Sequence, residues 1–386
     1  MDSRADLDFL REYNEALVVA LARRSPTFDR ATIAAGTGLT PQAVSKVIAR
    51  LTEAGLVEPV GVRKQGVGKP TTVYGLIPTS RYAIGAHVAR RTLRLVLVDL
   101  AGRIHDSVVS SLPADFTPAV LLDDLAAGVA AIGRDVTAGR LVGVGIGMVG
   151  PLDFVGGVVR SHDLRHWRDV SLRDLATDRL GLPVVVDKDV TAGVTAEAWR
   201  RGPEFRDAAL IMVESGVGAG LWLGGAAFRG AHTNAGEFGH TVIQLDGPLC
   251  VCGRHGCVEI VHDRAVAAGD LDLAARVLAA GILNLLQTVD VKHVVLAGAD
   301  LLDHVDRYTR AVSSALATEI RRPDWLTVEV TPTAMGADVI AAGAGMEVLN
   351  SFYGRRTPAV GGRGVPILSS SRGADRLSAP GAAPAR

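Results

Sequence analysis

The sequence predicts a chain of two parts, a helical N-terminal domain that ends in a β-hairpin and a longer, two-lobed α/β core. Three observations support this division. Apolar residues recur at helical spacing up to Gly55, two strands then surround a glycine-rich basic tip, and from Arg81 onward short apolar strands alternate with helices. A length of 386 residues suits two or three domains of ordinary size.

The predicted domain limits follow these changes of pattern. We place the N-terminal domain at residues 8–77, a small α/β lobe at 81–188 and a large α/β lobe at 189–353. From residue 354 onward Gly, Pro, Ser, Ala and Arg dominate, which predicts a disordered tail at 354–386.

Composition narrows the classes of protein to consider. Hydrophobic residues make up 48% of the chain and its formal net charge is zero, so contact with DNA would need a local basic patch. The N-terminus has early acidic residues and no apolar segment with a cleavage site, so we expect no secretory signal. No stretch of about eighteen apolar residues avoids charged or turn residues, which predicts no membrane span and a cytoplasmic protein.

The N-terminal elements follow from periodicity and capping residues. "LREYNEALVVALARR" has apolar residues on one helical face, and a short second helix begins near Ile33. Gly36 and Gly38 end it, and Thr40 caps a further helix with Pro41 at its first position. That helix stops at Gly55, and "LVEPVGVRKQGVGKPTTVYGLI" is typical of two strands around a tip.

This arrangement predicts a winged helix-turn-helix domain that binds double-stranded DNA. Side chains on the polar face of the third helix can contact base edges and phosphates, and basic residues of the tip can follow a groove or a phosphate row. The candidate DNA-binding residues are Gln42, Ser45, Lys46, Arg50, Arg63, Lys64 and Lys69. The alternative is a helical interaction module with a solvated charged face.

The core pattern begins with three consecutive antiparallel strands, "YAIGAHVA", "TLRLVLVDL" and "RIHDSVVSSL". A helix in "PAVLLDDLAAGVAAIGRDV" and buried strands in "LVGVGIGMVG" and "LPVVVDKD" complete the first unit. The second unit has strands in "AALIMVES" and "AGLWLGGAAF", a Cys/His loop, the helix "LAARVLAAGILNLLQTV" and the strand "HVVLAG". A helix to about Ile320, the strand "LTVEV" and a last helix near "GADVIAAGAGMEVLNSFYG" follow.

All three cysteines of the chain lie in one short loop, as Cys250, Cys252 and Cys257. Zinc prefers thiolate and imidazole ligands in a tetrahedron, and His240 upstream can supply the fourth ligand. Four protein ligands leave no open position, so we predict a structural zinc ion. His255 is an alternative nitrogen ligand, and the competing interpretation is a set of free or redox-active cysteines with a core histidine.

The motifs around this loop resemble those of the ROK family, named for repressors, open reading frames and sugar kinases. The resemblance rests on "GEFGH" followed by "CVCGRHGCVE", on "GIGMVGPLD" and on "DKDVTAGVTAE", and it extends from about residue 14 to 353. The "GVGKP" tip is similar to the wing of the family's transcriptional regulators. The resemblance implies a two-lobed actin-like, ribonuclease H-like core with sugar bound between the lobes.

The resemblance also implies roles for single residues. Glu237, His240 and Glu259 would surround the sugar, and Asp189 would match the catalytic aspartate of the family's kinases. His240 would bind zinc through one ring nitrogen and a sugar hydroxyl through the other. The alternative is structural, with Glu237 and Glu259 bracing the loop and Asp189 capping a helix.

Departures from the family pattern concern both chemistry and ligand. His87, Ala89, Arg90 and Arg91 occupy the positions of the kinases' Asp-x-Gly-Gly-Thr loop, so we predict that the ATP-phosphate loop at His87–Arg91 is degenerate and that kinase activity is lost.

Lys188 and Asp163 stand where the family usually has Asn near the sugar. Lys188 could meet an anionic group of the effector, or it could pair with Asp187 or Asp189 and reshape the pocket. The segment from Glu259 to "HVVLAG" is shorter than usual, which predicts that the large lobe lacks some of the family's helices.

Together these observations predict a cytoplasmic, zinc-containing, sugar-responsive regulator of transcription, more specifically a repressor of carbohydrate metabolism. Its partners would be a DNA operator, a sugar or sugar-derivative effector, and further copies of itself in a homodimer or homotetramer. The alternatives are an active ROK-type sugar kinase with an added DNA-binding domain, and a regulator that no longer binds sugar.

Overall fold

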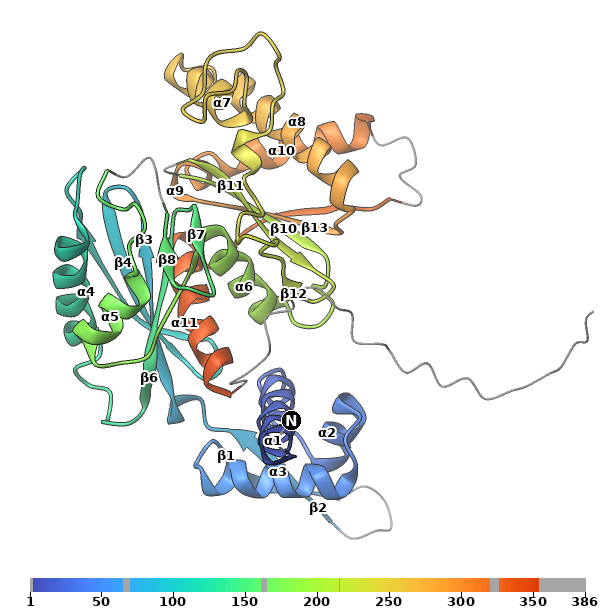
Figure 1. The fold of residues 1–386 in the computed structure, drawn as a ribbon. Helices are drawn as coiled ribbons and strands as arrows, with labels where there is room; N and C mark the ends of the chain where they lie inside the picture. The colour runs from blue at the N-terminus through green and yellow to red at the C-terminus, as the bar shows by residue number, and fades with distance from the viewer. Residues whose placement is uncertain (1–2, 65–69, 161–164, 215, 320–325, 354–386) are drawn as a thin grey trace, which may run out of the picture. The chain divides into compact units, whose positions relative to one another are not determined.

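The computed structural model describes residues 3–64, 70–160, 165–214, 216–319 and 326–353. Its N-terminal part contains the helices α1 (Ser3–Ala22), α2 (Arg30–Thr37) and α3 (Pro41–Glu53). Strands β1 (Val57–Arg63) and β2 (Thr71–Leu76) then pair antiparallel (Figure 1). The three helices and the hairpin agree with the sequence prediction. The predicted tail at 354–386 lies outside the described residues.

Local signals fix the boundaries of these helices. An Asp29 carboxylate oxygen accepts a hydrogen bond from the Thr32 amide at 2.8 Å and caps α2, which ends at Gly38 with a left-handed φ of 71°. Thr40 caps α3 in the same way. Apolar side chains of all three helices and the hairpin then form one small core, whose buried members include Val18, Val19, Ile33, Val44, Val47, Ile48, Leu51, Leu56 and Val57.

The first sheet of the core has the strand order β5-β4-β3-β6-β9. Strands β3 (Tyr82–Val88), β4 (Thr92–Asp99) and β5 (Ile104–Ser111) are antiparallel, whereas β6 (Leu141–Met148) and β9 (Val184–Lys188) run parallel to β3. Helix α4 (Pro118–Ile132) packs against β4 and β5, and α5 (Leu172–Leu180) packs against α4 and β9 (Figure 1). Helix α5 and the hairpin of β7 (Leu152–Asp153) and β8 (Val158–Val159) are absent from the sequence prediction.

The second sheet has the strand order β12-β11-β10-β13-β14. Strands β10 (Ala208–Val213), β11 (Val217–Leu223) and β12 (Ala226–Ala227) are antiparallel neighbours, and β13 (His293–Ala297) and β14 (Glu329–Pro332) extend the sheet in parallel. The strand predicted in "LTVEV", residues 326–330, thus begins three residues later, at Glu329. The helices of this part are α7 (Val258–Ala267), α8 (Leu271–Val289), α9 (Ala299–Leu302) and α10 (Val305–Glu319), and α7 was not predicted.

Helix α8 is long and apolar enough to cross a membrane, and it is the one such helix among the described residues. Its apolar residues face the protein interior, because Leu278, Ile282 and Leu286 are buried against the second sheet and α10. This burial is typical of a core helix in a folded domain rather than of a membrane span.

Two long helices, α6 (Asp189–Arg201) and α11 (Val339–Tyr353), pack on each other beside both sheets (Figure 1). Helix α11 lies directly on β3 and β6, where a Cβ atom on Gly85 would come within 1.7 Å of the Ala341 carbonyl oxygen. Glycine at this position thus permits the close approach of helix and sheet. Helix α11, the last helix among the described residues, returns to the first sheet, so the limits 81–188 and 189–353 remain an interpretation of the sequence.

Candidate functional site

The three cysteines and His240 converge on one point. Their ligand atoms all lie within 4.8 Å of one another. The distances between His240 Nδ1 and Cys250 Sγ and between Cys252 Sγ and Cys257 Sγ are both 3.6 Å. A tetrahedron with metal–sulfur bonds of about 2.3 Å has ligand–ligand edges of roughly 3.7 Å. The donor set and its spacing therefore fit one four-coordinate metal ion with a preference for sulfur and nitrogen.

The loop reaches this geometry because glycine allows it to fold back. Gly256 has a left-handed φ of 65°, and a Cβ atom there would lie 1.6 Å from the Gln244 carbonyl oxygen. Helix α7 begins directly after Cys257, and the short 3-10 helix η2 (Phe238–His240) presents His240. His255 is outside the cluster, since its Nδ1 lies 2.9 Å from the Gly247 carbonyl oxygen.

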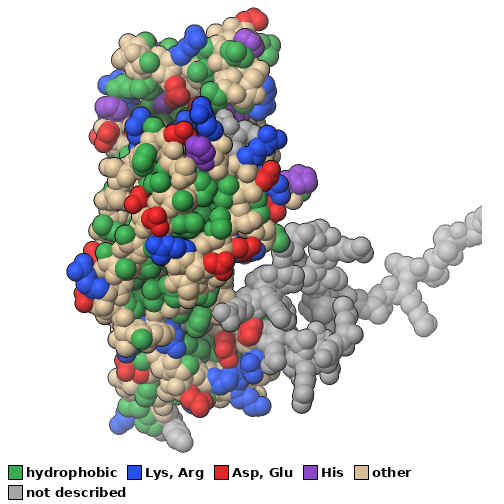
Figure 2. Space-filling model, turned by 60° about the vertical axis from the view of Figure 1, so that its left-hand side comes forward, with side chains coloured by type: hydrophobic (Ala, Val, Ile, Leu, Met, Phe, Trp, Pro, Cys, Tyr) green, Lys and Arg blue, Asp and Glu red, His purple; other side chains and the backbone are tan. Residues whose placement is uncertain are grey.

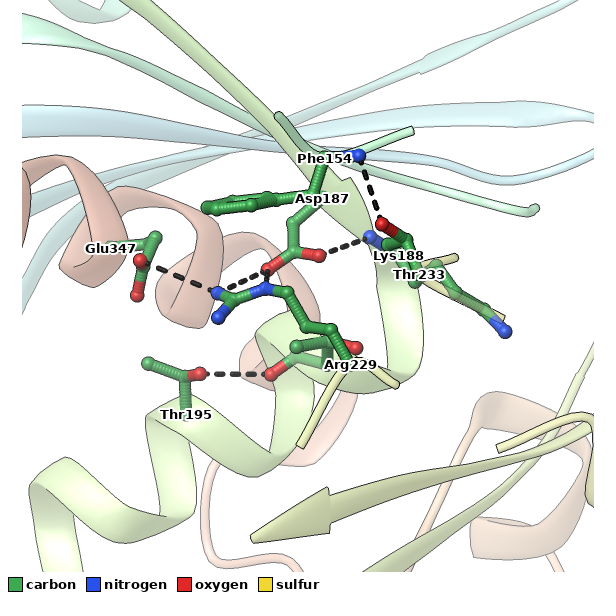
Figure 3. A network of polar contacts seen from close by, with 8 residues as sticks. Phe154, Asp187, Lys188, Thr195, Arg229, Thr233 and Glu347 are labelled. Atoms are coloured by element: carbon green, nitrogen blue, oxygen red, sulfur yellow. Dashed lines mark hydrogen bonds and ion pairs between the residues drawn. The ribbon is translucent and has the colours of Figure 1, made fainter. Parts of the chain in front are cut away.

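A second group of charged residues lies where strand β9 ends and α6 begins. Asp187 is buried and accepts two hydrogen bonds from Arg229, at 2.9 and 2.7 Å, and Arg229 also reaches Glu347 at 3.4 Å (Figure 3). The Arg229 guanidinium lies 3.9 Å from the centre of the Phe154 ring. Burial raises the pKa of Asp187 to about 6, although Arg229 acts in the opposite direction.

Lys188 and Asp189 directly follow Asp187, at the end of β9 and the start of α6. The Lys188 side chain is only 4% exposed, and its Nζ donates to Glu237 Oε1 at 2.5 Å and to the Ala235 carbonyl oxygen at 3.1 Å. Lys188 thus pairs with Glu237, and neither of the two partners considered from the sequence takes this role. Asp189 is also buried, and burial raises the pKa of its carboxyl group.

Glu259 and His240 stand on either side of the metal loop. Glu259 Oε2 accepts a hydrogen bond from the Val217 amide at 2.9 Å and so braces the turn between β10 and β11. His240 turns Nδ1 toward Cys250, which leaves Nε2 as the ring nitrogen for another partner. The structure therefore links Glu237 to Lys188, and Glu259 to backbone.

Sequence reasoning missed Glu214 at the end of β10. This half-buried carboxylate lies within electrostatic range of Asp189, Asp300 and Arg94, and burial together with the two acids raises its pKa. Its Oε2 is 3.5 Å from the amide nitrogen of Ala299, the first residue of α9. The signal in the sequence was a charged residue between an apolar strand and "SGVG".

The predicted degenerate loop lies at the turn from β3 to β4. His87 is a buried residue of β3, and burial lowers its pKa to about 4, so the ring is neutral at pH 7. The Ala89 amide bonds to the Thr92 carbonyl oxygen at 3.0 Å, which makes a tight turn with Arg90 and Arg91 exposed at its tip. Asp163 lies outside the described residues.

The predicted DNA-binding residues differ in their exposure and in whether an acidic side chain pairs with them. Gln42 and Lys46 are exposed on α3, and Ser45 is half-buried beside them. Arg50 is held by Glu15 of α1, with Nε 2.6 Å from Oε1, and exposed Arg63 lies 3.5 Å from Asp29. Lys64 is exposed at the end of the described part of the hairpin, and Lys69 lies outside the described residues.

The surface shows no single dominant charge on the face drawn in Figure 2, where basic and acidic side chains alternate with apolar ones. This agrees with the formal net charge of zero. A depression of about 350 Å³ is lined by α8 and α10 residues such as Arg276 and Arg307. None of the residues of the two candidate sites lines it.

Comparisons with known proteins agree with this architecture. The profile of the ROK family matches residues 83–268. The xylose repressor of Bacillus spizizenii (strain ATCC 23059 / NRRL B-14472 / W23) is 23% identical over 380 residues, which cover 90% of this chain and 98% of the repressor.

Solved structures show the same fold. A crystal structure of a ROK family transcriptional regulator, a homolog of the E. coli MLC protein, aligns with a TM-score of 0.72 at 18% identity over 89% of this chain and 97% of that chain. A ROK family glucokinase from Streptomyces griseus in complex with glucose and AMPPNP aligns with a TM-score of 0.61 at 22% identity, over 69% of this chain and 98% of that chain. The predicted two-lobed α/β core is thereby confirmed.

Proposed function

Because residues 83–268 form a domain of the ROK family, we propose that this protein is a sugar-responsive transcriptional repressor of carbohydrate metabolism. The main support for the proposal is that one chain contains both this domain and an N-terminal part of three helices and a hairpin. The xylose repressor relative aligns along 98% of its own length, so the likeness includes both parts.

The N-terminal part would act as a winged helix-turn-helix domain. Helix α3 would enter the major groove, with exposed Gln42 and Lys46 as its first contacts, and the basic tip of the hairpin would lie against the backbone. We expect Arg50 to position α3 through Glu15, since its Nε is already engaged in that ion pair. A homodimer or homotetramer would place two such domains on an operator with two half-sites.

The sugar would bind between the two lobes of the core, near the residues that the family resemblance implies. Asp189 and Glu237 would accept hydrogen bonds from adjacent hydroxyl groups, and His240 Nε2 would donate one. Lys188 and Glu259 would complete the surroundings. The metal, which we propose to be a structural Zn²⁺ ion held by His240, Cys250, Cys252 and Cys257, would fix the orientation of the His240 ring.

Kinase activity is the second candidate function, because a ROK family glucokinase shares the fold. Two features of this chain argue against it. His87 is buried and neutral where the family's kinases carry the metal-binding aspartate. The Glu214 carboxylate lies within electrostatic range of Asp189, where it would repel nucleotide phosphates. A regulator without any small ligand is the third candidate, and the Lys188–Glu237 ion pair favours it by occupying one of the expected sugar ligands.

Genome-wide mapping of the DNA sites that the protein occupies in the cells that produce it tests the proposal. We expect a small set of sites that share one motif with two half-sites, next to genes for the uptake or breakdown of a sugar. The identity of those genes would also name the effector. Occupancy that does not differ from that of an untagged control would contradict the proposal.

A further inference from the structure

One of the contacts between the N-terminal domain and the core is aromatic, beside the packing of α1 on α11 and of Leu100 in the N-terminal core. The guanidinium carbon of Arg23 lies 3.4 Å from the centre of the Trp199 ring. Arg23 directly follows α1, whose residues Val19 and Ala22 are buried in the small N-terminal core. The arginine is therefore fixed to the DNA-binding part of the chain, whereas Trp199 belongs to the last turn of α6.

Both partners of this contact are partly buried. Arg23 Nε is buried and has no hydrogen-bond partner within the described part of the chain, and burial lowers the pKa of the guanidinium to about 9. A guanidinium that lacks water and hydrogen bonds at one edge is held chiefly by the aromatic face below it. A contact of this kind is sensitive to small displacements of the ring.

Trp199 also packs against the turn between β4 and β5. A Cβ atom on Gly102 would lie 3.1 Å from the Trp199 ring and 3.1 Å from the Met346 side chain, so the turn after β4 packs closely against Trp199. Leu100 of that turn is itself buried in the core of the N-terminal domain. The ring is thus enclosed by Arg23, by the β4–β5 turn and by the α6 helix.

Helix α6 connects Trp199 to the proposed sugar site. It begins at Asp189 and is buried along its first ten residues, from Asp189 to Ala198. Ten residues of α-helix span about 15 Å. A helix that is buried along its length transmits a shift or a rotation of one end to the other, because its neighbours permit few intermediate positions.

We propose that α6 is the element that couples the two functions, with Asp189 as its effector end and the Trp199–Arg23 contact as its DNA-binding end. The inference rests on the proposed function and adds its route of regulation. An effector that binds Asp189 more tightly in one position of α6 would change the placement of Arg23 and hence of α1 and α3. Coupling of this kind is reciprocal, so bound DNA must also change the state of α6 near Asp189.

Reciprocity allows a test that needs no knowledge of the effector. The full-length protein first selects its operator from a pool of random DNA duplexes, and hydrogen exchange of residues 189–201 is then measured with and without the selected duplex. We expect bound DNA to change the exchange rate of amides at the Asp189 end of α6 by at least about fivefold, the low end of typical coupling factors. In Trp199→Leu the same change should fall below about twofold, and in Trp199→Phe, which keeps an aromatic face, it should persist.

Two further variants show whether a changed response reflects the loss of this contact or a general loss of folding. Arg23→Met keeps an unbranched stem that reaches as far as Nε but removes the charged guanidinium group, and it should behave like Trp199→Leu. Arg24→Met changes the exposed neighbour in the same way and should behave like the unmodified protein.

Three results would count against this account. Failure to select any duplex would overturn the proposed function itself. Selection of a duplex without any change in α6 of the unmodified protein would overturn only the coupling through α6. An unchanged response in both Trp199→Leu and Arg23→Met would overturn the role of their contact.

Discussion

The Lys188 ammonium nitrogen lies 2.5 Å from Glu237 Oε1, although 49 residues separate the two along the chain. The pair joins the end of β9 to the segment just before the metal loop. Because Glu237 neutralises Lys188, the proposed sugar site carries no free positive charge from this lysine. Asp189 and Glu214 add further negative charge nearby, so the site suits hydroxyl groups better than carboxylates or phosphates.

Replacing Lys188 with Asn should release Glu237 for a sugar hydroxyl. We expect the dissociation constant of D-glucose or D-xylose to fall by about fivefold, which corresponds to ~1 kcal/mol for an ion pair in which only Glu237 is partly exposed. Titration calorimetry of the full-length protein measures this change, with Lys292→Asn on the surface as the matched control. D-glucuronate should bind no more tightly than D-glucose to the unmodified protein. Tighter binding of the uronate would show instead that Lys188 receives an anionic group.

The metal centre should be required for stability. Elemental analysis should give one zinc ion per chain, and Cys257→Ser should abolish it, since Cys257 is buried and is one of the four clustered ligands. Loss of the ion should lower the melting temperature by roughly 5 °C or more. His255→Ala removes a histidine that lies outside the cluster and should leave both the zinc content and the melting temperature unchanged. Equal zinc content in Cys257→Ser and the unmodified protein would refute the assignment.

Buried His87 predicts a specific dependence of stability on pH. Its pKa is about 4 in the folded protein against 6.5 in the unfolded chain, so the unfolded state binds more protons between these values. The contribution of neutral His87 to the free energy of unfolding is therefore fully present above pH 6.5 and is lost as the pH falls toward 4. From pH 7.5 to 5.0 this loss amounts to about 2 kcal/mol.

The measurement compares urea unfolding at pH 7.5 and 5.0 for the unmodified protein, for His87→Met and for His232→Gln. His87→Met should lose about 2 kcal/mol less stability over this interval. His232 is exposed, so its variant should behave like the unmodified protein. The same loss in His87→Met would show that His87 is not the group that titrates.

The residues of α3 should contribute to DNA binding in different ways. Lys46→Ala should weaken binding to all sequences and reduce the salt slope of the binding constant by about one. Gln42→Ala should relax sequence preference at one base pair instead. Fluorescence anisotropy over a series of salt concentrations distinguishes the two, and Lys292→Ala controls for the loss of charge. A salt slope that is unchanged in Lys46→Ala would place this residue away from the phosphates.

Local patterns in the sequence predicted many of the helices and strands. Thr40, Gly36 and Gly38 predicted the boundary between the second and third helices, whereas the capping of α2 by Asp29 was not predicted. Helix α5 and its polar sequence gave a weak periodic signal, because only Leu172 and Ala176 are buried in it. The contact of α11 with the first sheet joins residues that are distant in sequence, and the only local sign of it was glycine at positions such as Gly85.

The candidate sites show the same distinction. The metal cluster was predictable because its ligands lie close together in one loop, and His240 is ten residues from Cys250. The partners of Lys188 and Glu259 were not, since they depend on how β9, η2 and the β10–β11 turn meet in space. Glu214 escaped notice because nothing in its own segment shows its proximity to Asp189.

The proposed function requires that this chain regulates DNA binding through a sugar site and does not phosphorylate sugar. One sample of the full-length protein with its selected duplex, ATP, Mg²⁺ and a panel of neutral sugars tests both parts at once, with DNA affinity and ADP formation as readouts. We predict that at least one sugar changes the affinity for the duplex by about tenfold or more while ADP stays at the level of a protein-free control. ADP formed in proportion to added sugar, with an unchanged DNA affinity, would contradict the account.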